Sequence, residues 1–321
     1  MTHTKFAGSW TAALFTALAC ALPSGLSNFH LFQFTQTYIY AIAMLGLNLL
    51  TGYSGQISIG HGAFYAAGAY VAAIMMDRWN IPYACTIPAA AVICFAAGYL
   101  FGLPALRLEG PYLALATFCL ALVVPQILKH FDQWTGGSQG IVLTKPAAPF
   151  GLPLNPDQWL YFLCLLVLLA LLFATAGLVQ GRVGRSLVAI RDNPAAASAM
   201  GIDTALYKTV TFGLSAAYTG VAGALSAIAV AYVAPDSFNI FLSDNLLIGV
   251  VIGGLGSISG ALYGAFFIEF VPTWTQDISK AAPWAIFGVV LIAFVYVMPL
   301  GIAGGLRAAI GQRFARAKPS Q

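Results

Sequence analysis

The segment Leu160–Leu178 reads LYFLCLLVLLALLFATAGL and contains neither a charged residue nor a proline. As a helix rising about 1.5 Å per residue, it is long enough to cross a hydrocarbon core of about 30 Å. The whole chain is similar in character, because 60% of its residues are hydrophobic and 7% are charged, whereas a soluble domain carries about 25% charged residues. These few charges cannot coat a surface in water, so the expected solvent is a bilayer.

A backbone inside a bilayer must satisfy its own hydrogen bonds, which leaves α-helices or a closed β-barrel. The long apolar runs favour helices, so we predict an all-α fold, a polytopic transmembrane helical bundle without a soluble catalytic domain. The first run follows Lys5 and resembles a signal peptide, but a second run follows closely, so we interpret it as a retained span. The candidate spans are Trp10–Leu26, Tyr38–Leu50, Ala63–Met76, Tyr83–Leu103, Tyr112–Leu128, Leu160–Leu178, Val210–Val233, Asn245–Phe270 and Trp284–Ile302.

Positive charges between the spans predict the orientation of the chain. The segment Gly181–Lys208 is the most charged internal loop, and residues 305–321 form a basic tail. The positive-inside rule places both in the cytoplasm. Counting spans backwards then puts the N-terminus and Arg107 in the cytoplasm and makes His130–Asp157 a long external loop. The loop charges are Arg182, Arg185, Arg191 and Lys208 against Asp192 and Asp203, and the tail contains Arg307, Arg313, Arg316 and Lys318.

Counting spans forwards from this loop gives a mismatch, because three simple spans after Lys208 would leave the basic tail outside the cell. The candidate span Asn245–Phe270 offers a solution, since the string GGLGSISG, Gly253–Gly260, lies in its middle. Each glycine destabilises a helix by about 1 kcal/mol relative to alanine. We therefore predict a helix broken at this string, forming a hairpin of two half-helices that returns to its own side.

A second glycine-rich string, Gly52–Gly62, interrupts the first half of the chain, and both strings contain the pair Ile-Ser. This is weak support for an internal repeat. Transporters often build their substrate path from interrupted helices in corresponding positions of two halves. The alternative is close helix packing through small residues, which is the role we expect for Gly98-x-x-x-Gly102 and Gly260-x-x-x-Gly264.

The charged loop is compatible with two short helices, Ser186–Ile190 and Ala195–Met200, with a turn and helix start at Asn193-Pro194. Gly201 suits the position just after the second helix. The loop also carries apolar side chains, which would either dock into another protein or lie on lipid headgroups. The residues alone leave both possibilities open. These apolar side chains are Leu187, Ala189, Ile190 and Met200.

The string Ala196–Gly201 resembles the Ala-Ala-x-x-x-Gly core of the coupling loop in ATP-binding-cassette import permeases. Three further strings resemble one branch of that superfamily, the branched-chain amino-acid permeases of the M-subunit type. All four occur in the expected order, and the resemblance covers the chain from about Leu47 to Ile302. The superfamily has a glutamate before the paired alanines, and this chain has Ala195 there. A charged contact at that position is therefore not expected. The three further strings are Leu47–Gln56 continuing to Gly60–Phe64, Glu109–Ala114 with Thr135–Gly140, and Gly253–Ser257.

This resemblance implies a permease subunit in a bacterial inner membrane. A periplasmic substrate-binding protein would deliver substrate, a second permease subunit would complete the path, and two cytoplasmic ATPases would drive transport. Branched-chain amino acids are the expected substrates, with urea, amides and aromatic acids as alternatives in the same class. The loop helix would sit on an ATPase, although its charges would alternatively serve only to set the membrane orientation. The expected ATPase contacts are Arg185, Arg191, Asp192, Ala196, Ala197 and Gly201.

We expect the substrate path along the two glycine-rich strings, with helix N-termini near Gly55–Ser58 facing the substrate carboxylate. His61 is either a hydrogen-bonded structural histidine or a substrate contact. Glu269, an acidic residue beside long apolar stretches, is a functional candidate by default or an interface residue. The expected path residues are Gly55, Gln56, Ser58, His61, Gly62, Tyr112, Gly253, Gly254 and Gly256.

Several other chemistries find no support in the sequence. No Gly-x-x-x-x-Gly-Lys-Ser/Thr string occurs, so ATP is expected on partner subunits and no cofactor on this chain. The four histidines are far apart and no His-Glu-x-x-His occurs, so we expect neither a metal site nor an enzyme. The five cysteines show no paired spacing and are interpreted as reduced thiols. The alternative of an ion-coupled secondary transporter would need acidic residues deep in the spans, and the spans hold almost none. The net charge of +4 reflects membrane orientation rather than nucleic-acid binding.

Overall fold

The computed structural model describes Pro23 and residues 27–106, 108, 110–149, 154–278 and 283–306. Most of the expected span Trp10–Leu26 lies outside these residues, as do Lys5, Arg107 and the basic tail from Arg307 onwards. The described α-helices are α2 (Asn28–Asn48), α3 (His61–Trp79), α4 (Tyr83–Ala105), α5 (Pro111–His130), α6 (Asp132–Thr135), α7 (Pro156–Gln180), α8 (Arg182–Asp192), α9 (Pro194–Ala199), α10 (Thr204–Val230), α11 (Ile240–Gly253), α12 (Ile258–Ile278) and α13 (Pro283–Val297).

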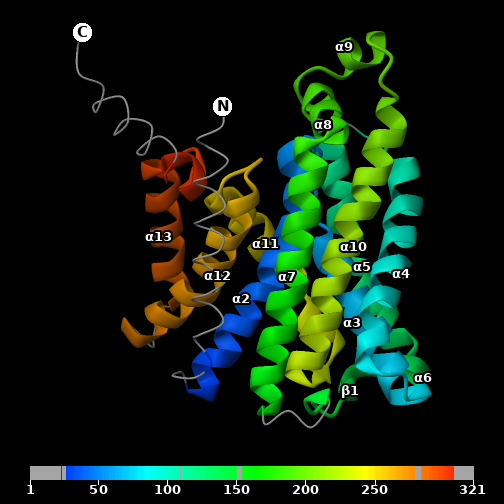
Figure 1. Cartoon of the computed structure of the whole chain (residues 1–321), viewed down its shortest axis with the longest axis vertical. Coiled ribbons are helices and arrows are strands. Elements are labelled where there is room, and N and C mark those ends of the chain that lie inside the picture. Colours follow the sequence, from blue (N-terminus) through cyan, green and yellow to red (C-terminus); the bar gives the residue numbers. More distant parts are fainter. Residues whose placement is uncertain are drawn as a thin grey trace.

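The shorter described elements lie between these helices. They are the π-helix η2 (Leu49–Tyr53), the 3₁₀ helices η3 (Gly137–Gln139) and η5 (Pro235–Phe238), and the strands β1 (Ile141–Val142) and β2 (Tyr232–Val233). The strands pair antiparallel, with Ile141 opposite Val233. The pair ties the loop after α5 to the segment after α10, at the end of the bundle opposite to α8 (Figure 1).

Five described helices are long and apolar enough to cross a membrane. Together with the predominance of helix, they confirm the prediction of an all-α, polytopic membrane bundle. They are Tyr83–Ala105, Pro111–His130, Pro156–Gln180, Thr204–Val230 and Ala285–Leu306.

Helix α10 lies at the centre of the bundle and packs on α3 and α4 through small residues. A Cβ atom at Gly68 of α3 would lie 2.1 Å from the carbonyl oxygen of Gly220, and one at Gly98 of α4 would lie 2.4 Å from the Cβ of Ala216. Lipid tails are as apolar as the helices, so association depends on such close packing rather than on exclusion of water. The packing role expected for Gly98-x-x-x-Gly102 is confirmed.

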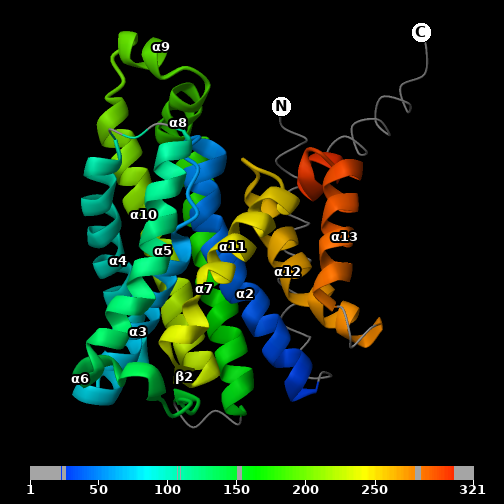
Figure 2. The same ribbon diagram turned by 180° about the vertical axis from the view of Figure 1, so that it is seen from behind.

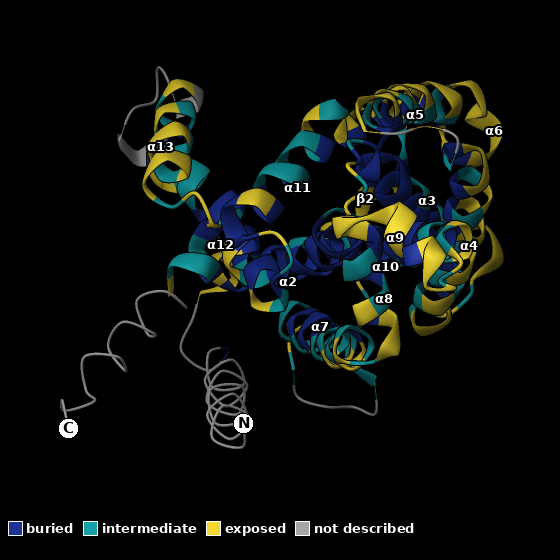
Figure 3. Cartoon of the chain, turned by 90° about the horizontal axis from the view of Figure 1, so that it is seen from above, coloured by how far each residue is buried: buried dark blue, intermediate teal, exposed yellow. Residues whose placement is uncertain are grey.

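Helices α5, α7 and α13 lie at the outside of the bundle and expose much of their surface (Figure 3). Phe173 of α7, for example, is 83% exposed. A bilayer accepts such side chains, since the surface around them is hydrocarbon or a partner subunit instead of water.

Helix α2 begins at Asn28 instead of the expected Tyr38. Polar side chains in its first turns break the apolar pattern, yet Thr35 and Thr37 are buried. Each hydroxyl donates to the carbonyl oxygen four residues earlier, at 2.8 and 2.9 Å. The helix satisfies these groups internally, which is why an apolar pattern alone placed its start too late.

The predicted break in Asn245–Phe270 is confirmed. Helix α11 ends at Gly253 and α12 begins at Ile258, and between them Gly254 and Gly256 have φ angles of +111° and +71°. L-residues with a side chain rarely adopt this region. Helix α11 runs towards the end of the molecule that carries α8, α12 runs away from it, and α13 returns (Figures 1 and 2). The two helices therefore form the expected hairpin.

Candidate functional site

The first interruption, residues 49–60, joins α2 to α3. It starts as the π-helix Leu49–Tyr53, after which the amide of Ser54 donates to the carbonyl oxygen of Leu49 at 3.2 Å. Gly55 follows with a φ angle of +74°, and the chain then reaches α3 without regular structure. Short π-helical turns are rare and frequently lie at functional sites, so this segment is a candidate for movement or binding.

The second interruption, residues 254–257, is a tight turn between α11 and α12. On either side of it the two helices touch through their backbones. A Cβ atom at Gly253 would lie 2.0 Å from the carbonyl oxygen of Gly260, and one at Gly264 would lie 2.0 Å from a carbonyl oxygen of α11. The packing role expected for Gly260-x-x-x-Gly264 is thus confirmed.

The two interruptions meet at Asn48, the last residue of α2. The amide of Gly256 donates to Oδ1 of Asn48 at 2.9 Å, and Nδ2 of Asn48 donates to the carbonyl oxygen of Ser257 at 2.7 Å. Asn48 is 1% exposed, so water does not compete for these bonds. A Cβ atom at Gly52 would lie 2.4 Å from the amide nitrogen of Gly256, so the two backbones are in contact.

Arg191, in the last turn of α8, reaches this contact from the charged loop. Its Nη1 donates to the carbonyl oxygen of Gly52 at 2.9 Å, while Nη2 lies 3.0 Å from Oδ1 of Asp192. The stem of the arginine covers Gly55, where an added Cβ would lie 2.7 Å from Cγ of Arg191. Arg191 therefore links the loop to the first interruption, and its guanidinium is held by both the bond to Gly52 and the pair with Asp192.

A buried polar cluster surrounds His61 at the start of α3. Ser215 of α10 donates to the carbonyl oxygen of Gly46 at 2.7 Å, so it accepts from Nε2 of His61 at 2.6 Å. Nδ1 is then the unprotonated nitrogen and accepts from Ser58 at 3.0 Å; this tautomer is assigned from the hydrogen-bond network. Because His61 is 1% exposed and both ring nitrogens are bonded, the geometry supports the interpretation as a structural histidine.

Two further hydroxyl groups accept hydrogen bonds from backbone amides around the start of α3. The amide of Gly62 donates to Ser243 of α11 at 2.9 Å, and the amide of Ile59 donates to Thr117 of α5 at 3.0 Å. The helix thus begins later than the expected Gly55–Ser58, because the positive φ angle and the irregular segment postpone it. The amide of Gly62 in its first turn and that of Ile59 just before it bond to side chains of neighbouring helices.

Most of the predicted path residues fall into two groups. Those of the first group lie in the two interruptions, and those of the second group belong to the buried cluster. Gly253 lies in the contact between α11 and α12, while Tyr112 is 70% exposed at the start of α5 and joins neither group. Their role in transport stays a prediction. The first group is Gly55, Gln56, Gly254 and Gly256, and the second is Ser58, His61 and Gly62.

The charged loop forms the two expected helices, α8 and α9. The side chain of Asn193 caps α9 by accepting from the amide of Ala196 at 3.0 Å, and Gly201 has a φ angle of +82°, as expected for the residue after a helix. Helix α9 lies at the tip of the molecule (Figure 1). Of the predicted ATPase contacts, Arg185, Arg191, Asp192 and Ala196 are exposed and Ala197 is buried.

The apolar residues of this loop need a correction. Leu187 and Ile190 are each 1% exposed and pack on the chain's own helices, so they are available neither to a partner nor to lipid. They turn inwards because they share the face of α8 that lies on the bundle, whereas Met200, after α9, is 83% exposed. The exposed large apolar side chains of this loop are Val183 on α8, at 41%, Met200, and Leu206 on α10, at 51%.

A cavity of about 230 Å³ lies where the first interruption, α8 and the start of α10 meet. The cations Arg191 and Lys208 line it. Gln56 also lines it, and its Nε2 donates to the carbonyl oxygen of Lys208 at 3.3 Å and to Ser54 at 2.8 Å. The cavity is polar and lies beside the bond between Arg191 and Gly52.

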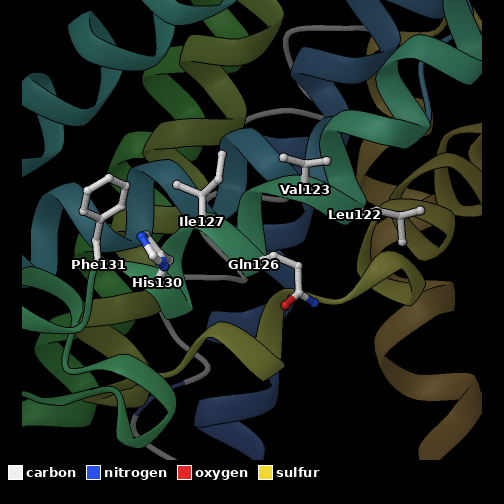
Figure 4. A pocket seen from close by; sticks show the side chains of 6 residues that line it. All are labelled: Leu122, Val123, Gln126, Ile127, His130 and Phe131. Atoms are coloured by element: carbon white, nitrogen blue, oxygen red, sulfur yellow. The ribbon is translucent and has the colours of Figure 1, made fainter.

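A larger hollow of about 550 Å³ is an open groove on the outer face of α5 (Figure 4). It lies apart from the interruptions and is mainly apolar, with one amide and one imidazole among its side chains. Its lining residues are Leu122, Val123, Gln126, Ile127, His130 and Phe131.

Asn48, Ser215 and Ser243 form central hydrogen bonds that sequence reasoning did not select. Asn48 had a signal, since it is a polar residue inside the apolar run before Gly52. The two serines had none, because single serines are common in membrane helices and their partners lie far away in sequence. Glu269 is half-buried on α12, close enough to Tyr40 of α2 to interact with it electrostatically.

In the described part of the chain, no three His, Cys, Asp or Glu residues stand close enough to hold a metal ion. The described cysteines are free thiols, as expected, and Cys20 lies outside the described residues. They are Cys85, Cys94, Cys119 and Cys164.

The family model described as branched-chain amino acid transport system / permease component matches residues 30–298. The chain belongs to this permease family. The permease protein LivM of a high-affinity branched-chain amino acid transport system is 31% identical in Escherichia coli K12 over 302 residues, covering 87% of this chain and 71% of the relative. LivM of Salmonella typhimurium LT2 is 30% identical over 327 residues, 95% of this chain and 77% of the relative.

A second type of permease from such systems is also similar. LivH of Escherichia coli K12 is 26% identical over 290 residues, which cover 83% of this chain and 91% of LivH. No solved structure shows a significant match. The predicted family is confirmed, and the chain is a transmembrane permease subunit of an ATP-binding-cassette importer.

Proposed function

We propose that this permease carries branched-chain amino acids inwards across the inner membrane, paired with a second permease subunit. Two cytoplasmic ATPases drive it, and a periplasmic binding protein delivers the substrate. The similarity to LivM supports the substrate class. The main support for the mechanism is the hydrogen bond from Arg191 of the loop helix α8 to the carbonyl oxygen of Gly52 in the first interruption.

The orientation follows from the distribution of charge. Lysines at the end opposite to α8 are paired with acids, Lys129 with Asp236 at 2.6 Å and Lys145 with Asp157 at 2.8 Å. The α8 end carries the charged loop with its four cations, as the positive-inside rule expects of a cytoplasmic side. The chain leaves α13 at the same end (Figure 1), which supports a cytoplasmic C-terminus. The N-terminus is proposed there from the same counting of spans.

The chemistry of the interior suits a small zwitterion with an apolar side chain. The described helices that span the bundle hold hydroxyls, backbone groups at the interruptions and few fixed charges, so they offer hydrogen bonds that suit a zwitterion. Such a path gives little selectivity by itself. The binding protein then makes most of the choice between substrates.

Reconstitution of the complete complex tests this function. The permease pair and the ATPases would be placed in proteoliposomes, with labelled leucine and the binding protein at the external face and ATP at the ATPase face. We expect uptake with ATP, no uptake with a non-hydrolysable analogue, and competition by isoleucine and valine. Competition by urea, amides or aromatic acids alone would contradict the substrate class, and uptake that survives without the ATPases would contradict the energy source.

A further inference from the structure

The guanidinium of Arg191 faces the chain's own backbone. Its Nη1 donates to the carbonyl oxygen of Gly52 at 2.9 Å, in the π-helical part of the first interruption. Hydrogen bonds from a charged donor are shorter and stronger than neutral ones. A displacement of α8 therefore acts on the backbone of the first interruption directly.

Asn48 carries the connection onward to the second interruption. It accepts from Gly256 and donates to Ser257, at 2.9 and 2.7 Å, from a position that is 1% exposed. Both partners are backbone groups, so the turn between α11 and α12 is tied to the end of α2 at two points. Neither bond can be exchanged for water without opening the core.

The contact is also sterically tight. Gly52 has no room for a Cβ beside Gly256, and Gly55 has none beside Arg191. Close-packed contacts transmit strain because they cannot be compressed. The hydrogen bonds hold the two interruptions together, and the glycine contacts leave no space for their backbones to move closer.

We propose that Arg191, Gly52 and Asn48 form a mechanical joint that moves both helix interruptions together when the charged loop is displaced. The inference rests on the proposed function, since it assumes that ATPases move the loop. Arg191 is then a positioning residue whose main contact lies within the permease. Loss of the joint lets the loop move and ATP be hydrolysed while the interruptions stay in place.

Two other roles for Arg191 give different results. A direct contact to the ATPase would lower uptake and ATP hydrolysis in the same proportion, and a charge that only sets orientation would be replaced fully by lysine. Lysine offers a single ammonium without the planar fork that bonds Gly52 and Asp192 at once. The variants Arg191→Ala and Arg191→Lys therefore separate the three roles.

The test measures the ratio of leucine uptake to ATP hydrolysis in the complete reconstituted complex. We expect Arg191→Ala to lower this ratio by about tenfold, as for loss of one charge-assisted hydrogen bond, with hydrolysis largely retained. Arg191→Lys should recover only part of it. Arg182→Ala removes an exposed charge from the same helix and should leave the ratio unchanged. An unchanged ratio in Arg191→Ala, full recovery in Arg191→Lys, or a proportional loss of uptake and hydrolysis would overturn the joint.

A double-mutant cycle adds a second measurement. If Asn48 and Arg191 serve one joint, the combined variant Asn48→Ala with Arg191→Ala should lower the ratio no further than the stronger single variant. Fully additive effects would overturn a shared joint. Absence of ATP-dependent uptake in the unmodified complex would instead count against the proposed function, so the two failures are distinguishable.

Discussion

The two helix interruptions are both rich in glycine, yet they are stabilised differently. The first has side chains of its own, since Ser58 and His61 continue into a hydrogen-bonded cluster with Ser215. The second is a short turn, and the side chain that bonds its backbone at Gly256 and Ser257 is Asn48 from the other half of the chain. The first interruption and the start of α3 are therefore held by side chains of α5, α10 and α11 as well as their own, whereas the second is bonded by Asn48 at the end of α2. We therefore expect the second interruption to follow the movement of the end of α2.

The largest effect is expected where the two interruptions touch. In Gly52→Ala, the new Cβ would lie 2.4 Å from the amide nitrogen of Gly256 and 2.2 Å from Oδ1 of Asn48. Because backbone must shift, the permease should lose about 3 kcal/mol of stability, and uptake should fall sharply. Thermal unfolding of the purified complex measures the loss of stability.

Gly177→Ala is the matched control for this change. Gly177 lies in α7 with no atom within 4 Å of the position that a Cβ would take. The substitution should raise stability by up to about 1 kcal/mol through helix propensity alone. Equal unfolding midpoints for the Gly52 and Gly177 variants would contradict the contact between the interruptions.

The next largest loss of stability is expected from Asn48→Ala, which tests how far the second interruption depends on this side chain. Asn48→Ala leaves the amide of Gly256 and the carbonyl of Ser257 without their partner, which should cost about 2 kcal/mol. Amide hydrogen exchange should rise in residues 254–257 and much less around His61. Ser259→Ala, beside the same turn, keeps both backbone bonds and serves as the control. An equal rise in exchange at both interruptions would contradict a dependence on Asn48 that is specific to the second.

A smaller effect is expected in the polar cluster of the first interruption. Ser215→Ala removes the acceptor of His61 and the donor to Gly46, at a cost of about 1 to 2 kcal/mol. Because this is a structural network, the substrate concentration for half-maximal uptake should stay the same while the unfolding midpoint falls. A raised half-maximal concentration at unchanged stability would favour the alternative role of His61 as a substrate contact.

The smallest loss of stability is expected at Gly256, where substitutions show whether glycine is needed for its φ angle or for lack of space. A Cβ at Gly256 would have room, with its nearest neighbour 3.5 Å away, but the φ angle there is +71°. Gly256→Ala should therefore cost about 1 kcal/mol, and Gly256→Asn, a residue that tolerates this region, should cost less. Unfolding midpoints of the two variants provide the comparison, and a greater loss for asparagine would indicate a steric limit instead.

Local chemistry predicted much of this fold. The uncharged run Leu160–Leu178 became α7, and the glycine string Gly253–Gly260 broke its helix because glycine weakens helices wherever it clusters. The cap at Asn193 and the positive φ angle at Gly201 also follow from neighbouring residues. In each case, the cause lies within a few positions of the effect.

The contacts between the two interruptions could not be predicted from neighbouring residues. Asn48 and Gly256 are separated by 208 positions, so no local pattern connects them. Arg191 looked like a surface charge for a partner, and the direction of its side chain became apparent only once α8 was packed with Leu187 and Ile190 inwards. Sequence patterns place the elements, while contacts between distant elements decide which residues act together.

The most direct test of the joint is a pair of distances in the complete complex, measured between spin labels with the native cysteines replaced and uptake retained. Labels at Arg182→Cys on α8 and Leu255→Cys in the second interruption should keep their distance between the nucleotide-free and ATP-bound states. The distance from Leu255→Cys to Val142→Cys, at the opposite end of the bundle, should change. A changing distance from Arg182→Cys to Leu255→Cys, with Leu255→Cys fixed relative to Val142→Cys, would contradict the joint.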